Sequence, residues 1–148
     1  MGTPGSDLSG AGDTFHTNED ADRNIPTYKG SVEAMVKLYA GDLDLKDPRI
    51  SPIYGDFDGF PPTLLVTGTR DLFLSNTART HIKLRRAGVE ADILVYEGMS
   101  HADYLREPTS PESHHLAREL DTFLTRHLRR SSRPAPPSMP RMESARWT

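Results

Sequence analysis

The stretch that decides the fold is Thr63-Leu64-Leu65-Val66-Thr67-Gly68, a short apolar run that follows the double proline Pro61-Pro62. Its apolar residues are consecutive, which is typical of a strand covered on both faces. A helical pattern follows from about Ser75 to Ala87 and ends at Gly88, a residue suited to close a helix. Ala91 to Tyr96 is predicted to be a second strand. This order predicts an α/β fold built on a right-handed β-α-β unit of two parallel strands.

Two flanking helices are predicted outside this unit. The first covers Ser31 to Ala40, with Ser31 as a candidate N-cap and Gly41 at the end. Its apolar stripe comprises Val32, Met35, Val36 and Tyr39. The last helix is expected from Pro111 to Leu128, with a face that comprises Leu116, Leu120, Phe123, Leu124 and His127. Residues 1–30 are polar and rich in Asp and Asn, so turns are expected there rather than regular structure.

Two ionisable residues stand where parallel sheets bind ligands, beyond the carboxyl ends of the strands. Asp71 follows the first strand and His101 follows the second. If the strands are neighbours, Asp71 can accept a hydrogen bond from one ring nitrogen of His101 and leave the other as a general base. The residues alone leave plainer interpretations open, with Asp71 as a helix cap and His101 as a solvated loop residue.

Five motifs follow one another in order along the chain: Asp47-Pro48-Arg49-Ile50-Ser51-Pro52-Ile53-Tyr54, Gly59-Phe60-Pro61-Pro62-Thr63-Leu64-Leu65, Gly68-Thr69-Arg70-Asp71, Leu84-Arg85-Arg86-Ala87-Gly88-Val89 and Gly98-Met99-Ser100-His101. Together they resemble the C-terminal part of the hormone-sensitive-lipase-like esterases, α/β-hydrolases that include acetyl esterases and lipases. The match runs in order from about Asp7 to Leu128. The resemblance implies a partial α/β-hydrolase fold, in which Asp71 and His101 are the acid and histidine of a catalytic triad.

The sequence departs from this family in two ways. Family members carry a His-Gly-Gly-Gly oxyanion loop and a Gly-Asp-Ser-Ala-Gly-Gly nucleophile elbow upstream, and neither motif occurs here. Ala102-Asp103-Tyr104 also stands where the family usually has an aromatic residue or Gly-Phe after the histidine. The first departure removes the nucleophile, and the second is a smaller change.

One segment imitates an elbow. Gly98-Met99-Ser100-His101-Ala102 follows a strand but ends in alanine. A standard elbow leads directly into a helix, whereas residues 103–111 contain two prolines and predict a loop. Downstream histidines lie only on the last helix, at His114, His115 and His127. Ser100 is therefore a weak decoy candidate, and no nucleophile is assigned.

Composition excludes several other classes. The 148 residues include no cysteine, so disulfides and cysteine-ligated metals are excluded. No apolar stretch approaches the roughly 18 residues of a membrane span, and the N-terminus lacks the apolar core of a signal peptide, so a cytoplasmic location is expected. His114-His115 and Glu19-Asp20-Asp22 lack metal-ligand spacing and are interpreted as solvated, so no metal or cofactor is expected.

The net charge of −3 is unevenly distributed. From Arg126 onward six arginines face one glutamate, which gives +5 and leaves −8 for the rest. Residues 129–148 are rich in Pro and Ser, and we expect a disordered basic tail. No aromatic residue stands between its arginines, so nucleic-acid binding is not expected.

The sequence thus predicts a polar segment over 1–30, the C-terminal portion of an α/β-hydrolase domain over 31–128, and a tail over 129–148. The main hypothesis is a fragment of a serine carboxylesterase that supplies Asp71 and His101 and is inactive alone. Its expected partners are a small acyl-ester substrate in a complete enzyme, and a complementary N-terminal hydrolase segment or a second copy of the chain. The alternative is a non-catalytic interaction or binding module derived from the same scaffold.

Overall fold

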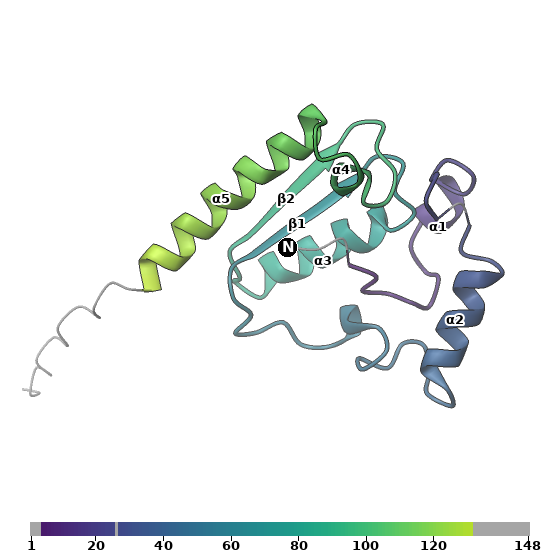
Figure 1. Ribbon diagram of the computed structural model, residues 1–148. Helices are drawn as coiled ribbons and strands as arrows, with labels where there is room; N and C mark the ends of the chain where they lie inside the picture. The colour runs from purple at the N-terminus through teal and green to yellow at the C-terminus, as the bar shows by residue number, and fades with distance from the viewer. Residues whose placement is uncertain (1–3, 26, 132–148) are drawn as a thin grey trace, which may run out of the picture.

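A computed structural model describes the backbone of residues 4–25 and 27–131 and the side chains up to Leu128 (Figure 1). The central unit consists of β1 (Thr63–Gly68), α3 (Leu74–Arg86) and β2 (Ala91–Tyr96). The other elements are α1 (Thr14–Thr17), α2 (Ser31–Ala40), the 3-10 helix η1 (Pro52–Tyr54), α4 (Asp103–Arg106) and α5 (Pro111–Ser131).

The predicted β-α-β unit is confirmed. β1 and β2 are parallel neighbours in a register that pairs Thr63 with Ala91 and Gly68 with Tyr96. They form a two-stranded sheet, to which the described residues add no further strand. Because the two strands run the same way, their carboxyl ends and the loops that follow them emerge at the same edge.

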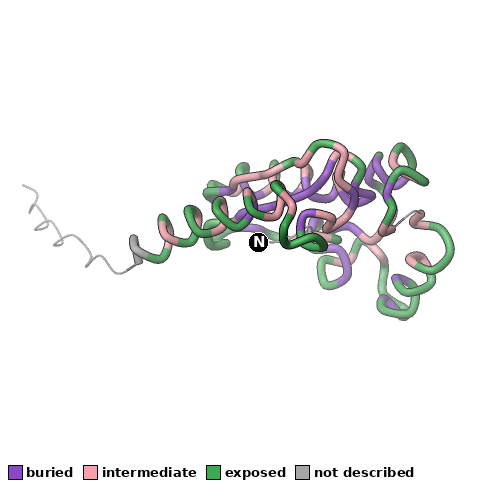
Figure 2. The backbone as a smooth tube through the Cα atoms, turned by 45° about the horizontal axis from the view of Figure 1, so that its top comes forward, coloured by how far each residue is buried: buried purple, intermediate pink, exposed green. Residues whose placement is uncertain are grey.

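Alternation along β1 divides the core between two faces of the sheet. Leu65 packs on one face with Leu84 of α3, while Leu64 and Val66 pack on the other with Leu116 of α5. Side chains of a strand point to opposite faces in turn, so a fully apolar strand needs a cover on each side. α3 and α5 are these covers (Figure 1), and buried residues gather about the sheet (Figure 2).

The helix α2 has the predicted bounds but not the predicted packing. Gly30, not Ser31, is its N-cap, and Gly41 follows as expected. Of the predicted apolar stripe Val36 is buried, whereas Met35 and Tyr39 are 62% and 67% exposed. The helix stands apart from the sheet in Figure 1, and two of the four residues of its apolar stripe are exposed to solvent.

The N-terminal segment is more ordered than the sequence suggested. Turns dominate it, but Thr14–Thr17 form the short helix α1, and Phe15 is 3% exposed in a cluster with Leu72 and Phe73. The aromatic rings of Phe15 and Phe73 meet edge to face at 5.6 Å. One apolar anchor thus fixes a polar segment onto the loop after β1.

Two predictions at the C-terminal end need correction. Asp103–Arg106 form a short helix, α4, where a loop was expected. α5 continues to Ser131, three residues beyond Leu128, so residues 129–131 are helical where the sequence predicted the start of a disordered tail. The rest of that tail, residues 132–148, lies outside the described residues.

Of the described helices, none combines the length and apolar character that crossing a bilayer requires. The cytoplasmic location stays a prediction.

Candidate active site

A close backbone approach brings the loop after β1 against the loop after β2. A Cβ atom added at Gly68 would lie 2.0 Å from the Met99 carbonyl oxygen, so only glycine fits there. The Arg70 N–H donates to that same carbonyl at 3.0 Å, and the Gly98 N–H donates to Thr69 Oγ1 at 2.8 Å. These contacts join the two loops directly above the strand ends, where the sequence predicted that they would meet.

Asp71 is fixed in the first loop with no solvent exposure. Its Oδ2 accepts a hydrogen bond from Thr67 Oγ1 at 2.9 Å, and its Oδ1 accepts one from the Phe73 N–H at 2.8 Å. The plainer interpretation of Asp71 as a helix cap is not correct, because Phe73 is the N-cap of α3 and no side chain caps this helix. Donors on both oxygens stabilise a buried carboxylate and fix its orientation.

His101 meets Asp71 from the second loop. Its Nδ1 lies 3.2 Å from Asp71 Oδ1, and its side chain is 25% exposed. The ring of Phe73 packs against the imidazole edge to face at 5.4 Å. With Asp71 as acceptor, Nδ1 carries the proton, which leaves Nε2 for proton transfer. The predicted contact between the two residues is thus present.

The pKa of His101 is raised above its ordinary value of 6.5. The hydrogen bond to Asp71 is the largest cause, partial burial opposes it, and the charges of Asp71 and Asp22 add to it. A carboxylate beside an imidazole favours the protonated ring. The arrangement therefore suits a histidine that accepts a proton and holds it briefly.

Ser100 is placed differently from a nucleophile. Its side chain is completely buried, and its Oγ accepts a hydrogen bond from the Arg23 N–H at 3.0 Å. The helix that follows is only four residues long, and Asp103 at its start accepts from the Ser100 N–H at 2.9 Å. The two prolines, at positions 108 and 111, lie beyond the last residue of this helix and so do not prevent it. A buried hydroxyl in this setting cannot reach an ester carbonyl.

Asp22 was wrongly interpreted as part of a solvated turn. It is 1% exposed and its Oδ2 accepts hydrogen bonds from the Leu72 N–H at 2.8 Å and the His101 N–H at 3.2 Å. No local motif reveals this, because an acidic residue among Asp and Asn looks like any other polar turn. Only the fold brings it against both loops of the pair.

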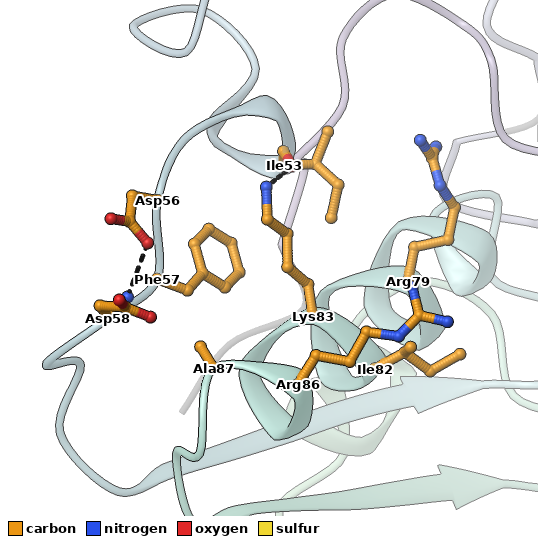
Figure 3. A pocket seen from close by; sticks show the side chains of 9 residues that line it. All are labelled: Ile53, Asp56, Phe57, Asp58, Arg79, Ile82, Lys83, Arg86 and Ala87. Atoms are coloured by element: carbon orange, nitrogen blue, oxygen red, sulfur yellow. Dashed lines mark hydrogen bonds between the residues drawn. The ribbon is translucent and has the colours of Figure 1, made fainter.

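A hollow of about 580 Å³ lies elsewhere, between α3 and the segment after η1 (Figure 3). Phe57, Lys83 and Arg86 line it, and neither Asp71 nor His101 does. Lys83 is held there by the carbonyl oxygen of Ile53 at 2.5 Å. This hollow is therefore separate from the acid–histidine pair.

Metal ligands are not gathered anywhere in residues 4–25 and 27–128, where no three His, Asp or Glu side chains are grouped as a bound ion requires. Of the histidine pair on α5, His114 is exposed. His115 is not simply solvated, because its Nδ1 and the Tyr96 hydroxyl share a hydrogen bond of 2.9 Å.

Comparison with known proteins agrees with the resemblance seen in the motifs. A family model described as alpha/beta hydrolase fold matches residues 1–105. The chain is 28% identical over 127 residues to an esterase from Acinetobacter venetianus, which covers 83% of this chain and 40% of that protein.

Solved structures show the same likeness. The crystal structure of esterase E25 superposes with a TM-score of 0.84 at 58% identity, over 85% of this chain and 38% of that one. An esterase from the bacterial hormone-sensitive lipase family gives a TM-score of 0.77 at 29% identity, over 85% and 42%. The chain thus spans about two fifths of the length of these relatives.

Proposed function

This chain belongs to the α/β-hydrolase fold family, and from this premise we propose that Asp71 and His101 are the acid and the base of a serine carboxylesterase. The observation that carries the proposal is the 3.2 Å contact between the fully buried Asp71 and the partly exposed His101. The pair stands beyond the carboxyl ends of adjacent parallel strands, where α/β sheets bind ligands. The esterases among its relatives favour ester hydrolysis as the reaction.

In the proposed reaction His101 acts through Nε2. It takes the proton of a serine hydroxyl as the oxygen attacks the carbonyl of a small acyl ester, and then gives that proton to the leaving alcohol. Asp71 stabilises the imidazolium formed between these two steps. The raised pKa of His101, caused chiefly by its hydrogen bond to Asp71, supports this role.

The serine and the oxyanion donors must come from a complementary N-terminal hydrolase segment, in a longer chain or a separate one. A second copy of this chain has the same sequence and so adds no elbow. We therefore propose that the 148-residue chain alone does not hydrolyse esters. A single oxyanion donor contributes about 100-fold to 1000-fold in kcat, and without the serine there is also no acyl intermediate.

The experiment joins the two parts. The portion of esterase E25 that this chain does not cover is fused to the chain, and turnover of p-nitrophenyl acetate is measured for the fusion and for the chain alone. We expect turnover only by the fusion. His101→Ala should abolish this turnover. Asp71→Asn should lower kcat by about 10,000-fold, because the carboxylate no longer holds the imidazole in the correct tautomer.

Ser100→Ala tests the decoy in the same fusion, where turnover should be retained and lowered only by the loss of the Arg23 N–H contact to Ser100 Oγ. Turnover by the isolated chain that disappears with Ser100→Ala would instead identify Ser100 as a nucleophile. Full activity of the fusion with His101→Ala would refute the proposed base.

One observation favours a second candidate function, a non-catalytic binding module. Met35, Leu38 and Tyr39 of α2 are 62%, 86% and 67% exposed, an unusual amount of apolar surface on one short helix. A fusion that is folded but inactive would favour this alternative.

A further inference from the structure

We propose that Asp22 is a positioning residue that holds the loops of Asp71 and His101 together, an inference that rests on the proposed function of that pair. Asp22 lies in the N-terminal segment, about 50 residues before the first of these loops. Its carboxylate acts on their backbone.

The carboxylate is saturated by four backbone donors. Oδ2 accepts from the Leu72 N–H at 2.8 Å and from the His101 N–H at 3.2 Å. Oδ1 accepts from the Asn24 N–H at 2.8 Å and from the Ile25 N–H at 3.1 Å. A carboxylate has about four acceptor positions, and Asp22 is 1% exposed, so its orientation is fixed on every side.

One oxygen thus bridges the two halves of the pair. Leu72 is the residue after Asp71, and His101 is the proposed base itself, so Oδ2 sets the separation of the two backbones. The contact between His101 Nδ1 and Asp71 Oδ1 is 3.2 Å long, at the upper end of ordinary N–H···O distances. A small separation of the loops is therefore enough to break it.

The residues beside Asp22 fasten the histidine loop a second time. Asn24 Nδ2 donates to the His101 carbonyl at 2.6 Å and to Asp103 Oδ1 at 2.8 Å. Arg23 forms an ion pair of 2.5 Å with Asp103, and its N–H donates to Ser100 Oγ. Residues 22–24 therefore hold residues 100–103 at several points.

The charges around His101 come from three segments. Asp71 faces it from the loop after β1, and Asp22 adds a second negative charge from the N-terminal segment. Arg23 and Asp103 neutralise one another. Because Asp22 acts on His101 both by charge and by position, a test must separate these two effects.

The test is the variant Asp22→Asn of the 148-residue chain. NMR measures the chemical shifts of the His101 imidazole nitrogens and the proton resonance of its Nδ1–H. An amide offers one oxygen and one NH2 group, so two of the four backbone donors would face another donor. We expect the downfield Nδ1–H resonance to be lost and the two ring tautomers to become mixed.

Two matched variants separate position from charge and from fold stability. Asp20→Asn removes the same charge two residues away at an exposed site, and its positive φ of 65° suits asparagine. Asp7→Asn disturbs another fully buried carboxylate, which pairs with Arg79 of α3. Both should keep the Nδ1–H resonance.

A folded Asp22→Asn variant that keeps the resonance and the tautomer of the native chain would overturn the proposal. If that variant does not fold, Asn24→Ala decides, because Asn24 is only partly buried and donates to the His101 carbonyl. Loss of the resonance in Asn24→Ala supports the proposal, and an unchanged resonance overturns it.

The fusion with the E25 segment provides the functional readout. There Asp22→Asn should lower kcat by up to about 100-fold with little change in KM, because the substrate still binds. An inactive fusion with native Asp22 would refute the proposed function alone, since the resonance of His101 reports positioning without any turnover.

Discussion

Gly68 ends β1 where the backbone of Met99 crosses it, and its replacement by alanine tests whether this approach holds the candidate site together. The added Cβ would lie 2.0 Å from the Met99 oxygen and 2.6 Å from its carbonyl carbon. Real Cβ atoms do not approach closer than 3.0 Å, so the loop after β2 must move by about 1 Å or more. Both obstructing atoms are backbone, and no side-chain rotation relieves them.

The cost follows from the contacts that this movement breaks. The Arg70 N–H bond to the Met99 carbonyl and the Gly98 N–H bond to Thr69 Oγ1 join the two loops. Each hydrogen bond contributes about 1 kcal/mol, and steric strain of this kind costs about 1 to 3 kcal/mol. We expect Gly68→Ala to lower the free energy of unfolding by about 3 to 5 kcal/mol and to separate His101 from Asp71.

Urea denaturation measures the stability, and the Nδ1–H resonance of His101 reports the pair. Gly5→Ala is the control, because a Cβ there meets only Leu8 Cδ2, at an ordinary 3.6 Å. If Gly68→Ala unfolds at the same urea concentration as Gly5→Ala and keeps the His101 resonance, the close approach does not hold the loops.

Three further predictions concern the pair, the histidine loop and the core. Asp71→Asn should destabilise the chain by about 1.5 to 3 kcal/mol at acid pH, and the difference in unfolding free energy between the native chain and the variant should become smaller as the pH rises. Because the pKa of His101 is raised, its pairing with Asp71 contributes stability that is fully present below pH 6.5 and is lost as the pH rises through the folded pKa. Urea midpoints of both proteins from about pH 5 to pH 9 measure this, and a stability difference that does not change with pH would contradict it. Ala102→Gly should raise the thermal unfolding midpoint, because glycine adopts the left-handed φ of 59° without strain. That strain costs about 1 to 2 kcal/mol, and the greater flexibility of glycine in the unfolded chain offsets about 0.5 to 1 kcal/mol of the gain. A lower midpoint would show that Ala102 is not strained. Leu84→Ala, at 1% exposure, should cost about 2 to 5 kcal/mol, whereas Ile82→Ala on the exposed side of α3 should stay within about 0.5 kcal/mol; equal losses in denaturation would contradict the assigned core.

The sequence was sufficient for the elements whose signals are local. β1 has a consecutive apolar run after a double proline, β2 is mostly apolar and lies between Gly88 and Gly98, and the predicted α3 is off by one residue at each end. Parallel pairing then follows from chain order, and the meeting of Asp71 with His101 follows from pairing. Each step needs only residues near one another in the chain or a general rule of topology.

The missed features depend on contacts between distant segments. Asp22 looks like a turn residue, and its burial arises from donors at Leu72 and His101, 50 and 79 residues away. For α2 the sequence predicted an apolar stripe, but part of that stripe is exposed. Periodicity shows that a helix face is apolar, but not that another surface covers it. The short helix α4 was missed because the prolines at positions 108 and 111 lie beyond its last residue, Arg106.

The departure after the histidine also has a structural meaning. Ala102 adopts a left-handed φ of 59°, a conformation that favours glycine. Two residues further on, Tyr104 is 1% exposed and donates to the Val66 carbonyl at 3.1 Å. The loop therefore retains its anchor on β1 while it accepts strain beside His101.

The acid–histidine pair is complete within the described residues even though the proposed enzyme is not. Its loops are joined to each other at Met99 and to the N-terminal segment at Asp22, and all these partners belong to this chain. A complementary segment would therefore meet a pair that is already oriented and would need to bring only the serine and the oxyanion donors. It follows that the resonance of His101 should be the same in the isolated chain as in an active fusion, and a pair that forms only in the fusion would contradict this order of assembly.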